Sequence, residues 1–452
     1  MSNIVILEDF FDFNSNDPIN RIAYTKEDMD YKIKIIKKMQ ELGMNITIDK
    51  IGNICGSISI GNNPKKTLAI GSHTDSVYDG GQFDGPVGVM VGLQTVEELL
   101  KSQKCTGTIN VAIYACEESS RFGNACIGSK YLNGDITEKD FDKIVDQSDK
   151  ITTLRDAILS ATEYLKQNVE GIQEVNKIFN KVDYSLEAHI EQYESLTSKF
   201  KNQESIGIIT SIGSAVRIKY KAKGFSGHTG STPMKERQNA VDAVSKIGNK
   251  VRKLGKEYER YNFGRASQVE INTIGHNGSF NQIPHEAEGL IDFRLLGQNT
   301  PERVLDDFNK IIKKVEKKTK TTIEPTIVSQ GTPVITDPSL NSDIATICTQ
   351  NGIQHMDMPS WAGQDTGYIP ANAKTMIFIP STGGSHNPSE STGKRFIGTA
   401  TRVFADLSKS LLLQKFRDEQ VVPGYRHPVS QSDDFQTSDV IINDPDHTLQ
   451  TR

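Results

Sequence analysis

The sequence predicts an α/β fold: a mostly parallel or mixed sheet flanked by helices, with a smaller α+β domain inserted into it. Helix-like and strand-like segments alternate through the first half of the chain, as they do in βα units. Near residue 213 the pattern changes to strands in which apolar and polar residues alternate, which suits a sheet with one face in water. The βα pattern then resumes near residue 330. These changes predict a larger domain of residues 1–212 and 330–413 and an inserted domain of residues 213–329.

The elements of the larger domain follow from hydrophobic periodicity. Lys26–Leu42 has the spacing of an amphipathic helix, and Thr67–Gly71 is a short apolar strand. Pro86–Lys101 predicts a helix with proline in its first turn. Ile109–Ala115 is a near-continuous apolar run, as expected of a strand buried on both faces. Further segments are predicted at 184–188 (strand), 340–351 (helix) and 375–379 (strand).

The inserted domain has the order β-α-β-β-α-β. Its strands are predicted at 215–222, 269–274, 289–295 and 321–328, and its helices at 237–258 and 301–317. Beyond Leu413 the chain becomes polar and loses periodicity. Residues 414–452 are therefore predicted to form a loosely held or disordered tail.

Composition excludes several function classes. The 452 residues carry a formal net charge of −5, which argues against a nucleic-acid partner. Apolar runs stay below the roughly 20 residues that cross a bilayer, and no signal peptide is visible. The five cysteines are scattered and form no CxxC pair, which indicates reduced thiols. We therefore expect a cytoplasmic protein with no nucleic-acid or membrane partner.

Polar side chains that can bind a metal follow several of the predicted strands. In open α/β sheets, ligands bind beyond the carboxyl ends of the strands, so these side chains are predicted to converge on one rim. The five candidates are His73, Asp84, Glu118, His189 and His386. Nitrogen and carboxylate ligands without thiolate suit zinc, and would also accept manganese or cobalt.

Each candidate has a simpler explanation when it is taken alone. A single histidine at a strand end is more often structural, and the pair Glu117–Glu118 is more often surface charge. The order His-x-Asp, Gly-Gly-x-x-Asp-Gly and then Glu-Glu, each behind an apolar strand, is hard to produce by chance. Cys116, which precedes the two glutamates, can be read as a nucleophile, but a buried structural thiol fits the preceding strand better.

The charges of such a site predict a mechanism. Two divalent ions bridged by Asp84, with Glu118 as a terminal ligand, leave the site cationic, and a bridging water becomes a hydroxide near neutral pH. Glu117 then acts as general base and passes the proton to the leaving nitrogen. Asp75 is predicted to hydrogen-bond the far ring nitrogen of His73 and fix its tautomer.

Seven motifs in a fixed order carry a resemblance to a known family. They are Gly71–Ser76, Gly80–Gly85, Glu117–Gly123, His189–Gln192, Gly224–Met234, Asn281–Pro284 and Ser385–Glu390. Together they resemble the hydantoinase/carbamoylase branch of the dinuclear zinc aminoacylase and carboxypeptidase superfamily. That branch holds N-carbamoyl-L-amino acid hydrolases, allantoate amidohydrolases and β-ureidopropionases. The resemblance covers roughly residues 20 to 413.

The resemblance implies a role for each matching position. His73 and His189 would complete one metal site, and Glu118 and His386 the other. The larger domain would be the dinuclear metal catalytic domain, and the inserted domain a dimerisation or lid domain of a homodimer. The remaining implied roles are oxyanion stabilisation by His228, possible across a subunit boundary, carboxylate binding by Asn281 and Arg294, and contact with the ureido end by Gln192 and the backbone near Gly384.

Simpler readings stay open for three of these positions. Arg294 can pair with Asp292, and both His228 and Asn281 can be turn residues. The chain also departs from the family pattern. Gln364 stands where the branch has histidine in a Gly-His-Asp motif, and Tyr193 stands where a glycine follows His-Ile-Glu-Gln.

The leading hypothesis is a metal-dependent amidohydrolase that cleaves a ureido or carbamoyl C–N bond of a small carboxylate-bearing substrate, of the N-carbamoyl-L-amino acid or allantoate type. An aminoacylase or dipeptidase of the same superfamily is the first alternative. A non-catalytic binding protein derived from the fold is the second, and the intact set of candidate ligands argues against it.

Overall fold

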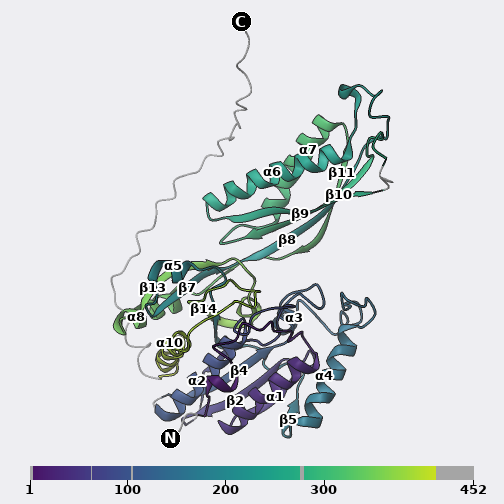
Figure 1. The fold of residues 1–452 in the computed structure, drawn as a ribbon. Coiled ribbons are helices and arrows are strands. Elements are labelled where there is room, and N and C mark those ends of the chain that lie inside the picture. Colours follow the sequence, from purple (N-terminus) through teal and green to yellow (C-terminus); the bar gives the residue numbers. More distant parts are fainter. Residues whose placement is uncertain (1–3, 63, 103–104, 275–278, 414–452) are drawn as a thin grey trace. The chain divides into compact units, whose positions relative to one another are not determined.

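The computed structural model describes residues 4–62, 64–102, 105–274 and 279–413 (Figure 1). In this part of the chain, a ten-stranded sheet forms the larger layer. Its strands lie in the order β12 (Val334–Ile335), β7 (Ser205–Ile212), β14 (Ala371–Ile379), β6 (Val182–Ile190), β3 (Thr67–His73), β4 (Gly107–Tyr114), β2 (Ile54–Ile60), β1 (Asn45–Ile48) and β5 (Ile172–Glu174), with β13 (Gln354–Ser360) paired to β7.

The centre of this sheet is parallel and its flanks are mixed. β14, β6, β3 and β4 pair in parallel, so their carboxyl ends share one edge. β2 joins β4 antiparallel, and β14 pairs antiparallel with β7. Every residue of β4 is buried except Thr108, which explains the apolar run in its sequence.

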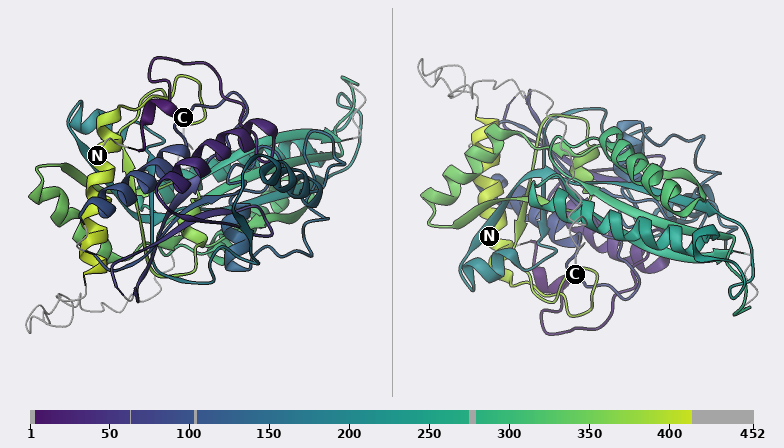
Figure 2. Two further views of the ribbon diagram at one scale, coloured as in Figure 1. Left: turned by 90° about the horizontal axis from the view of Figure 1, so that it is seen from below. Right: turned by 90° about the horizontal axis from the view of Figure 1, so that it is seen from above.

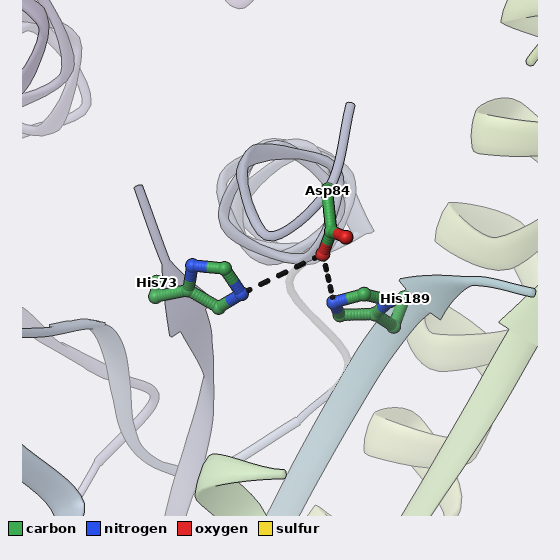
Figure 3. A group of neighbouring side chains, drawn as sticks. All are labelled: His73, Asp84 and His189. Carbon is green, nitrogen blue, oxygen red and sulfur yellow. Dashed lines mark ion pairs between the residues drawn. The ribbon is translucent and has the colours of Figure 1, made fainter. Parts of the chain in front are cut away.

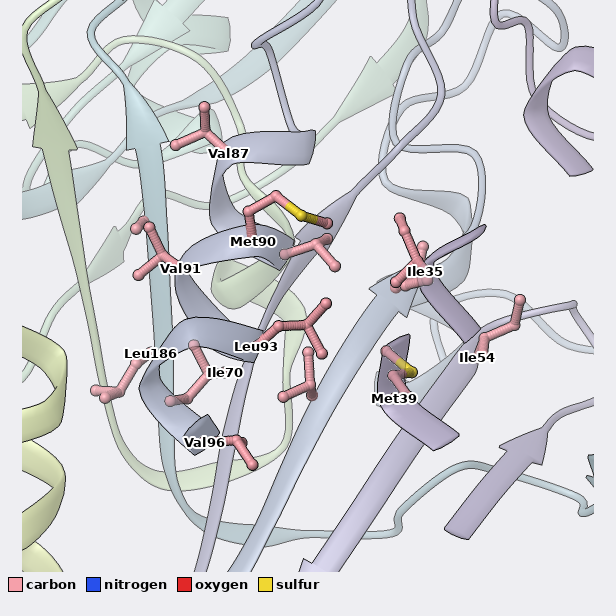
Figure 4. Close-up of a cluster of buried hydrophobic side chains, with 14 of the residues drawn as sticks. Ile35, Met39, Ile54, Ile70, Val87, Met90, Val91, Leu93, Val96 and Leu186 are labelled. Carbon is pink, nitrogen blue, oxygen red and sulfur yellow. The ribbon is translucent and has the colours of Figure 1, made fainter. Parts of the chain in front are cut away.

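Helices cover the large sheet and pack their apolar side chains into its core. They are α1 (Lys26–Glu41), α2 (Pro86–Ser102), α3 (Ile127–Asn133), α4 (Leu154–Asn168), α5 (Ser195–Phe200), α8 (Pro338–Gln350), α9 (Asp365–Tyr368) and α10 (Lys394–Leu412), with a short 3₁₀ turn η1 (Leu7–Asp9). In Figure 4, Val91 and Leu93 of α2 lie beside Ile70 of β3 and Leu186 of β6. The Thr25 side chain caps α1 by accepting a hydrogen bond from the backbone N–H of Asp28.

The second sheet is antiparallel and has its own core. Its order is β11 (Thr322–Gln330), β8 (Ser214–Lys223), β10 (Glu286–Leu295) and β9 (Gly264–Ile274). Helices α6 (Ala240–Arg260) and α7 (Pro301–Thr319) lie side by side on one face of this sheet, and η2 (Met234–Glu236) precedes α6 (Figures 1 and 2). Buried and half-buried residues alternate along β10, as expected when one face packs on helices.

The predicted fold class is confirmed: a mixed sheet flanked by helices is accompanied by a smaller sheet whose strands and helices follow the order β-α-β-β-α-β. The domain boundaries at 212/213 and 329/330 stay predictions. The predicted polar tail, residues 414–452, lies outside the described residues. Within the described ranges, no helix combines the length and apolar character needed to cross a membrane.

Candidate metal centre

Five polar side chains from distant parts of the sequence meet at the carboxyl edge of the parallel strands. His73 is the last residue of β3, His189 lies near the end of β6, and Glu118 follows β4. Asp84 lies in the loop between β3 and α2, and His386 lies between β14 and α10. The structure thus brings together the five side chains that the sequence nominated as metal ligands, in two groups that share Asp84.

The first group is His73, Asp84 and His189 (Figure 3). Nε2 of His189 lies 2.8 Å from Oδ1 of Asp84, and Nε2 of His73 lies 3.8 Å from the same oxygen. All three side chains are buried. Two imidazole nitrogens and a carboxylate oxygen therefore point at one small volume.

The second group is Asp84, Glu118 and His386. Nε2 of His386 lies 3.1 Å from Oε1 of Glu118 and 3.6 Å from Oδ2 of Asp84. The two oxygens of Asp84 thus face different groups, Oδ1 the first and Oδ2 the second. Within each group the candidate ligand atoms lie within 4.8 Å of one another. This donor set fits two adjacent divalent ions that share one carboxylate.

The two buried histidines are oriented by backbone carbonyl groups. Nδ1 of His73 lies 2.9 Å from the carbonyl oxygen of Asp75, and Nδ1 of His189 lies 2.9 Å from that of Ile190. Because a carbonyl only accepts, each Nδ1 carries a proton and each Nε2 is turned toward Asp84. The hydrogen bond to His73 comes from the Asp75 backbone, whereas Oδ1 of the Asp75 side chain, the predicted partner, lies 3.7 Å from the same nitrogen.

The loop that carries Asp84 is fixed by a residue from the end of the fold. Oε1 of the buried Glu390 accepts hydrogen bonds from the backbone N–H groups of Phe83 (3.0 Å) and Asp84 (2.9 Å). A Cβ on Gly81 would lie 2.5 Å from this oxygen, and a Cβ on Gly85 (φ +85°) would lie 2.5 Å from the His73 ring. Both glycines of the motif are therefore required by close approach.

Burial and the neighbouring rings set the charge of Asp84. Burial alone would raise the pKa of its carboxyl, but the rings of His189, His73 and His386 lower it below its ordinary value. Burial lowers the pKa of His73 to about 3. Burial acts in the same direction on His189, but the Asp84 carboxylate outweighs it and raises the pKa of that ring to about 9. Asp84 is therefore an anion surrounded by imidazoles.

Glu117 lies beside the first group, and its two carboxylate oxygens have different neighbours. Oε2 lies 3.8 Å from Nε2 of His73, and Oε1 accepts a 3.2 Å hydrogen bond from the Cys126 thiol. The pKa of its carboxyl is raised well above its ordinary value, first by burial and then by the nearby carboxylates of Glu118, Asp365 and Asp75. Such a carboxylate takes up a proton readily.

The thiol of Cys116 is a structural group. It is fully buried, and its Sγ donates weakly to the carbonyl oxygen of Glu118 at 3.8 Å. Burial raises the pKa of this thiol well above its ordinary value, and nearby Asp75 raises it further. A thiol that holds its proton is a poor nucleophile, so the structural interpretation of Cys116 is the better one.

The residues implied in substrate binding have their hydrogen-bond partners outside the five candidate ligands. His228 and Asn281 are exposed and adjacent: the backbone N–H of Thr229 donates to the carbonyl of Asn281 at 2.9 Å. Arg294 pairs with Asp292 through two hydrogen bonds of 2.8 and 3.1 Å, the alternative partner foreseen from the sequence. Among the described residues, no hydrogen bond or ion pair joins His228, Asn281 or Arg294 to the five candidate ligands.

The remaining predicted positions lie at or near the loops around the centre. Gln192 is half-buried just after β6, and a Cβ on Gly384 (φ +76°) would meet no atom within 4 Å. Tyr193 is 83% exposed. Gln364, by contrast, is buried, with its Nε2 3.5 Å from the Ser360 hydroxyl.

Sequence reasoning did not find the supporting contacts of three residues. Glu390 and Ser385 belong to one of the sequence motifs, but the motif does not indicate their contacts with Asp84. The Glu390 carboxylate accepts from the Asp84 backbone N–H, and the Ser385 hydroxyl donates to Oδ2 of Asp84. Cys126, which contacts Glu117, carried no signal at all, because a lone cysteine between Ala125 and Ile127 reads as a core residue.

Comparison with known proteins agrees with this architecture. An "uncharacterized hydrolase" of Haemophilus influenzae is 30% identical over 400 residues, 88% of this chain and 93% of that protein. An N-carbamoyl-L-amino-acid amidohydrolase of Paenarthrobacter aurescens is 27% identical (88% and 95% covered), and an allantoate amidohydrolase of Bacillus subtilis is 28% identical (86% and 92%). The crystal structure of a hydantoinase/carbamoylase family amidase from Burkholderia multivorans superposes with a TM-score of 0.73 at 24% identity (88% and 94%).

The resemblance inferred from the motifs is therefore confirmed. The pattern of peptidase family M20/M25/M40 matches residues 69–410, which include all five candidate ligands, Glu117 and His228. The chain belongs to peptidase family M20/M25/M40.

Proposed function

We propose that this protein is a metal-dependent amidohydrolase that cleaves the ureido or carbamoyl C–N bond of a small carboxylate-bearing molecule, of the N-carbamoyl-L-amino acid or allantoate type. The observation that carries the proposal is the pair of ligand groups that share Asp84, one on each carboxylate oxygen. The names of two relatives, an N-carbamoyl-L-amino-acid amidohydrolase and an allantoate amidohydrolase, support the substrate class.

The donor set suits two divalent ions, zinc first and manganese or cobalt as alternatives. His73 and His189 would hold one ion, Glu118 and His386 the other, and Asp84 both. When bound, the two ions would supply positive charge that lowers the pKa of a water molecule between them.

Glu117 is the proposed general base. Its Oε2 faces the candidate ligands, within 3.8 Å of Nε2 of His73, and burial with neighbouring carboxylates raises its pKa. This carboxylate takes a proton from the attacking water and returns it to the nitrogen of the breaking C–N bond. Cleavage of an N-carbamoyl substrate then yields the free amine, with the carbamoyl group leaving as carbon dioxide and ammonia.

His228 is proposed to stabilise the oxyanion that develops on the attacked carbonyl. Its Nδ1 accepts hydrogen bonds from the backbone N–H groups of Gly230 (3.0 Å) and Ser231 (3.3 Å), so its proton sits on Nε2. An exposed Nε2–H is a donor that can reach a substrate or the site of a second subunit. A cytoplasmic homodimer is part of this proposal, as are a carboxylate contact from Asn281 and Arg294 and a ureido contact from Gln192 and Gly384.

The substrate class is tested with purified protein reconstituted with zinc, manganese or cobalt. Release of ammonia from N-carbamoyl amino acids or allantoate is expected, with the Glu117→Gln variant as control for contaminating activity. Release of amine only from N-acyl amino acids or dipeptides would instead make the protein an aminoacylase or dipeptidase. A protein that binds no divalent ion and hydrolyses none of these compounds would be a non-catalytic binding protein.

A further inference from the structure

Cys126 is a buried residue, outside the five candidate ligands, whose side chain contacts the proposed general base. It precedes α3 and has a left-handed backbone (φ +56°), a conformation that is costly for a residue with a side chain. Its Sγ lies 3.2 Å from Oε1 of Glu117, within the range of a thiol hydrogen bond, and the residue is 1% exposed. The strained backbone thus turns a thiol toward the proposed base.

The backbone on both sides of this contact holds it in place. The N–H of Cys126 donates to the carbonyl of Glu117 at 2.8 Å, and the N–H of Gly128 donates to the carbonyl of Ala115 at 2.8 Å. A Cβ on Gly128 would lie 2.5 Å from the backbone nitrogen of Ala115, so only glycine permits this approach. The start of α3 is therefore tied to the end of β4, and the thiol and the carboxylate have little freedom to separate.

The two oxygens of Glu117 are distinguished by this arrangement. Oε1 accepts from the thiol, and Oε2 lies 3.8 Å from Nε2 of His73 on the side of the candidate ligands. Among the hydrogen bonds of the described residues, the thiol is the donor to the Glu117 carboxylate. Since a carboxylate can rotate about its last torsion, a donor on one oxygen selects which oxygen faces the reaction.

We propose that Cys126 is a positioning residue for the proton-transfer carboxylate: its S–H holds Oε1 of Glu117, so that Oε2 faces the metal ligands. This inference rests on the proposed function of Glu117 as general base. Burial raises the pKa of the Cys126 thiol well above its ordinary value, so the sulfur keeps the proton that it donates. Serine can replace this donor, and alanine cannot.

Infrared spectroscopy of the S–H stretch tests the contact without any activity. The Cys126 band is isolated as the difference between the wild type and Cys126→Ser, both reconstituted with metal. Removing the acceptor in Glu117→Ala should move this band to the higher frequency of a free thiol. The matched control is Glu118→Ala, which changes the adjacent carboxylate and should leave the band in place. A band that is the same in the wild type and in Glu117→Ala overturns the proposal.

Kinetics test the consequence. Cys126→Ala should lower kcat by about fivefold to tenfold, the loss expected from one modest hydrogen bond, with KM and bound metal unchanged. Cys126→Ser should retain most of the wild-type kcat. Cys348→Ala is the control for deleting a buried thiol, because Cys348 of α8 is also fully buried but lies in the helix layer.

A double-mutant cycle separates positioning from a structural role. In the Glu117→Gln background, Cys126→Ala should cause little further loss of kcat, because the group that it positions is already disabled. An equal loss in both backgrounds would show that Cys126 acts on the fold and would overturn the proposal. If the wild type hydrolyses no ureido or amide substrate, the proposed function fails, whereas the infrared result still reports on the thiol contact.

Discussion

Oδ2 of Asp75 accepts a 3.0 Å hydrogen bond from the backbone N–H of Glu118. Oδ1 of the same carboxylate accepts from the N–H of Glu117 at 3.2 Å, and the Asp75 carbonyl receives Nδ1 of His73 at 2.9 Å. Asp75, which is fully buried just after β3, thus orients His73 at the end of that strand and the two glutamates that follow β4. Residues in this kind of supporting role orient the ligands of a metal site, and replacing them weakens metal binding or activity.

Asp75→Asn is therefore expected to weaken metal binding by about 10- to 100-fold. An amide turns an N–H group toward one of the two backbone N–H groups, so the loop of Glu117 and Glu118 loses an acceptor. Competition with a chromophoric chelator measures the affinity. Asp79→Asn, an exposed change in the loop after β3, is the control and should bind metal normally. Equal affinity in both variants would remove Asp75 from this role.

Glu117→Gln separates proton transfer from metal binding. The variant should keep its divalent ions but lose about 10²- to 10⁴-fold in kcat, the usual contribution of a general base. Metal content by elemental analysis and steady-state kinetics are the two measurements. Glu118→Gln serves as the comparison, since it removes a candidate ligand and should lower the metal content. Wild-type turnover by Glu117→Gln would contradict the assignment.

Arg294→Ala tests carboxylate binding against a structural role. If Arg294 leaves Asp292 to bind substrate, its loss should raise KM about tenfold or more with kcat little changed, as expected for uniform binding. Arg217→Ala is the matched control, because Arg217 also pairs with Asp292, at 3.2 Å. A similar rise of KM in both variants would mean that the Asp292 pairing, and not substrate contact, is what the enzyme requires.

Asp49 makes stability depend on pH in a direction opposite to that of most carboxylates. Burial raises the pKa of Asp49 from 3.8 to about 7, although hydrogen bonds from Asn53 oppose the change. The native state therefore holds a proton that the unfolded chain releases, so this contribution is full below about pH 4 and is lost as pH rises toward 7.

The measurement is the difference in urea stability between the wild type and Asp49→Asn, with metal saturating. The stability of the wild type relative to the variant should decrease between pH 4 and 7, by at most about 4 kcal/mol. Since other titrating groups are shared, they cancel in the difference. A difference that stays constant over this range would show that Asp49 is ionised in the folded protein.

Much of the fold could be predicted because its signals are local. The apolar run of β4 and the amphipathic spacing of α1 indicated buried strands and a surface helix, and both lie where they were expected. The antiparallel flank β1–β2 was not predicted. β2 mixes glycine and serine with isoleucine, and it is placed in the sheet by pairing with β4 on one side and β1 on the other.

The candidate site, like the fold, could be predicted only in part. The five candidate ligands could be predicted because each lies at the end of a recognisable strand or in the loop after it, and the parallel sheet places strand ends together. The contacts of Cys126 and Asp75 depend on the path of the loops between strands, which residue type does not encode. The pairing of Arg294 with Asp292, two residues away, was predicted only as an alternative to substrate binding.

The hydrogen bonds from the Asp84 loop to Glu390 have a consequence for biosynthesis. The carboxylate that both ligand groups share is held by a side chain 306 residues further along the chain. A polypeptide still lacking that region has His73 and Glu118 but no anchor for Asp84 and no His386. The two metal ions should therefore bind only after the region that carries His386 and Glu390 has been synthesised and has folded onto the Asp84 loop.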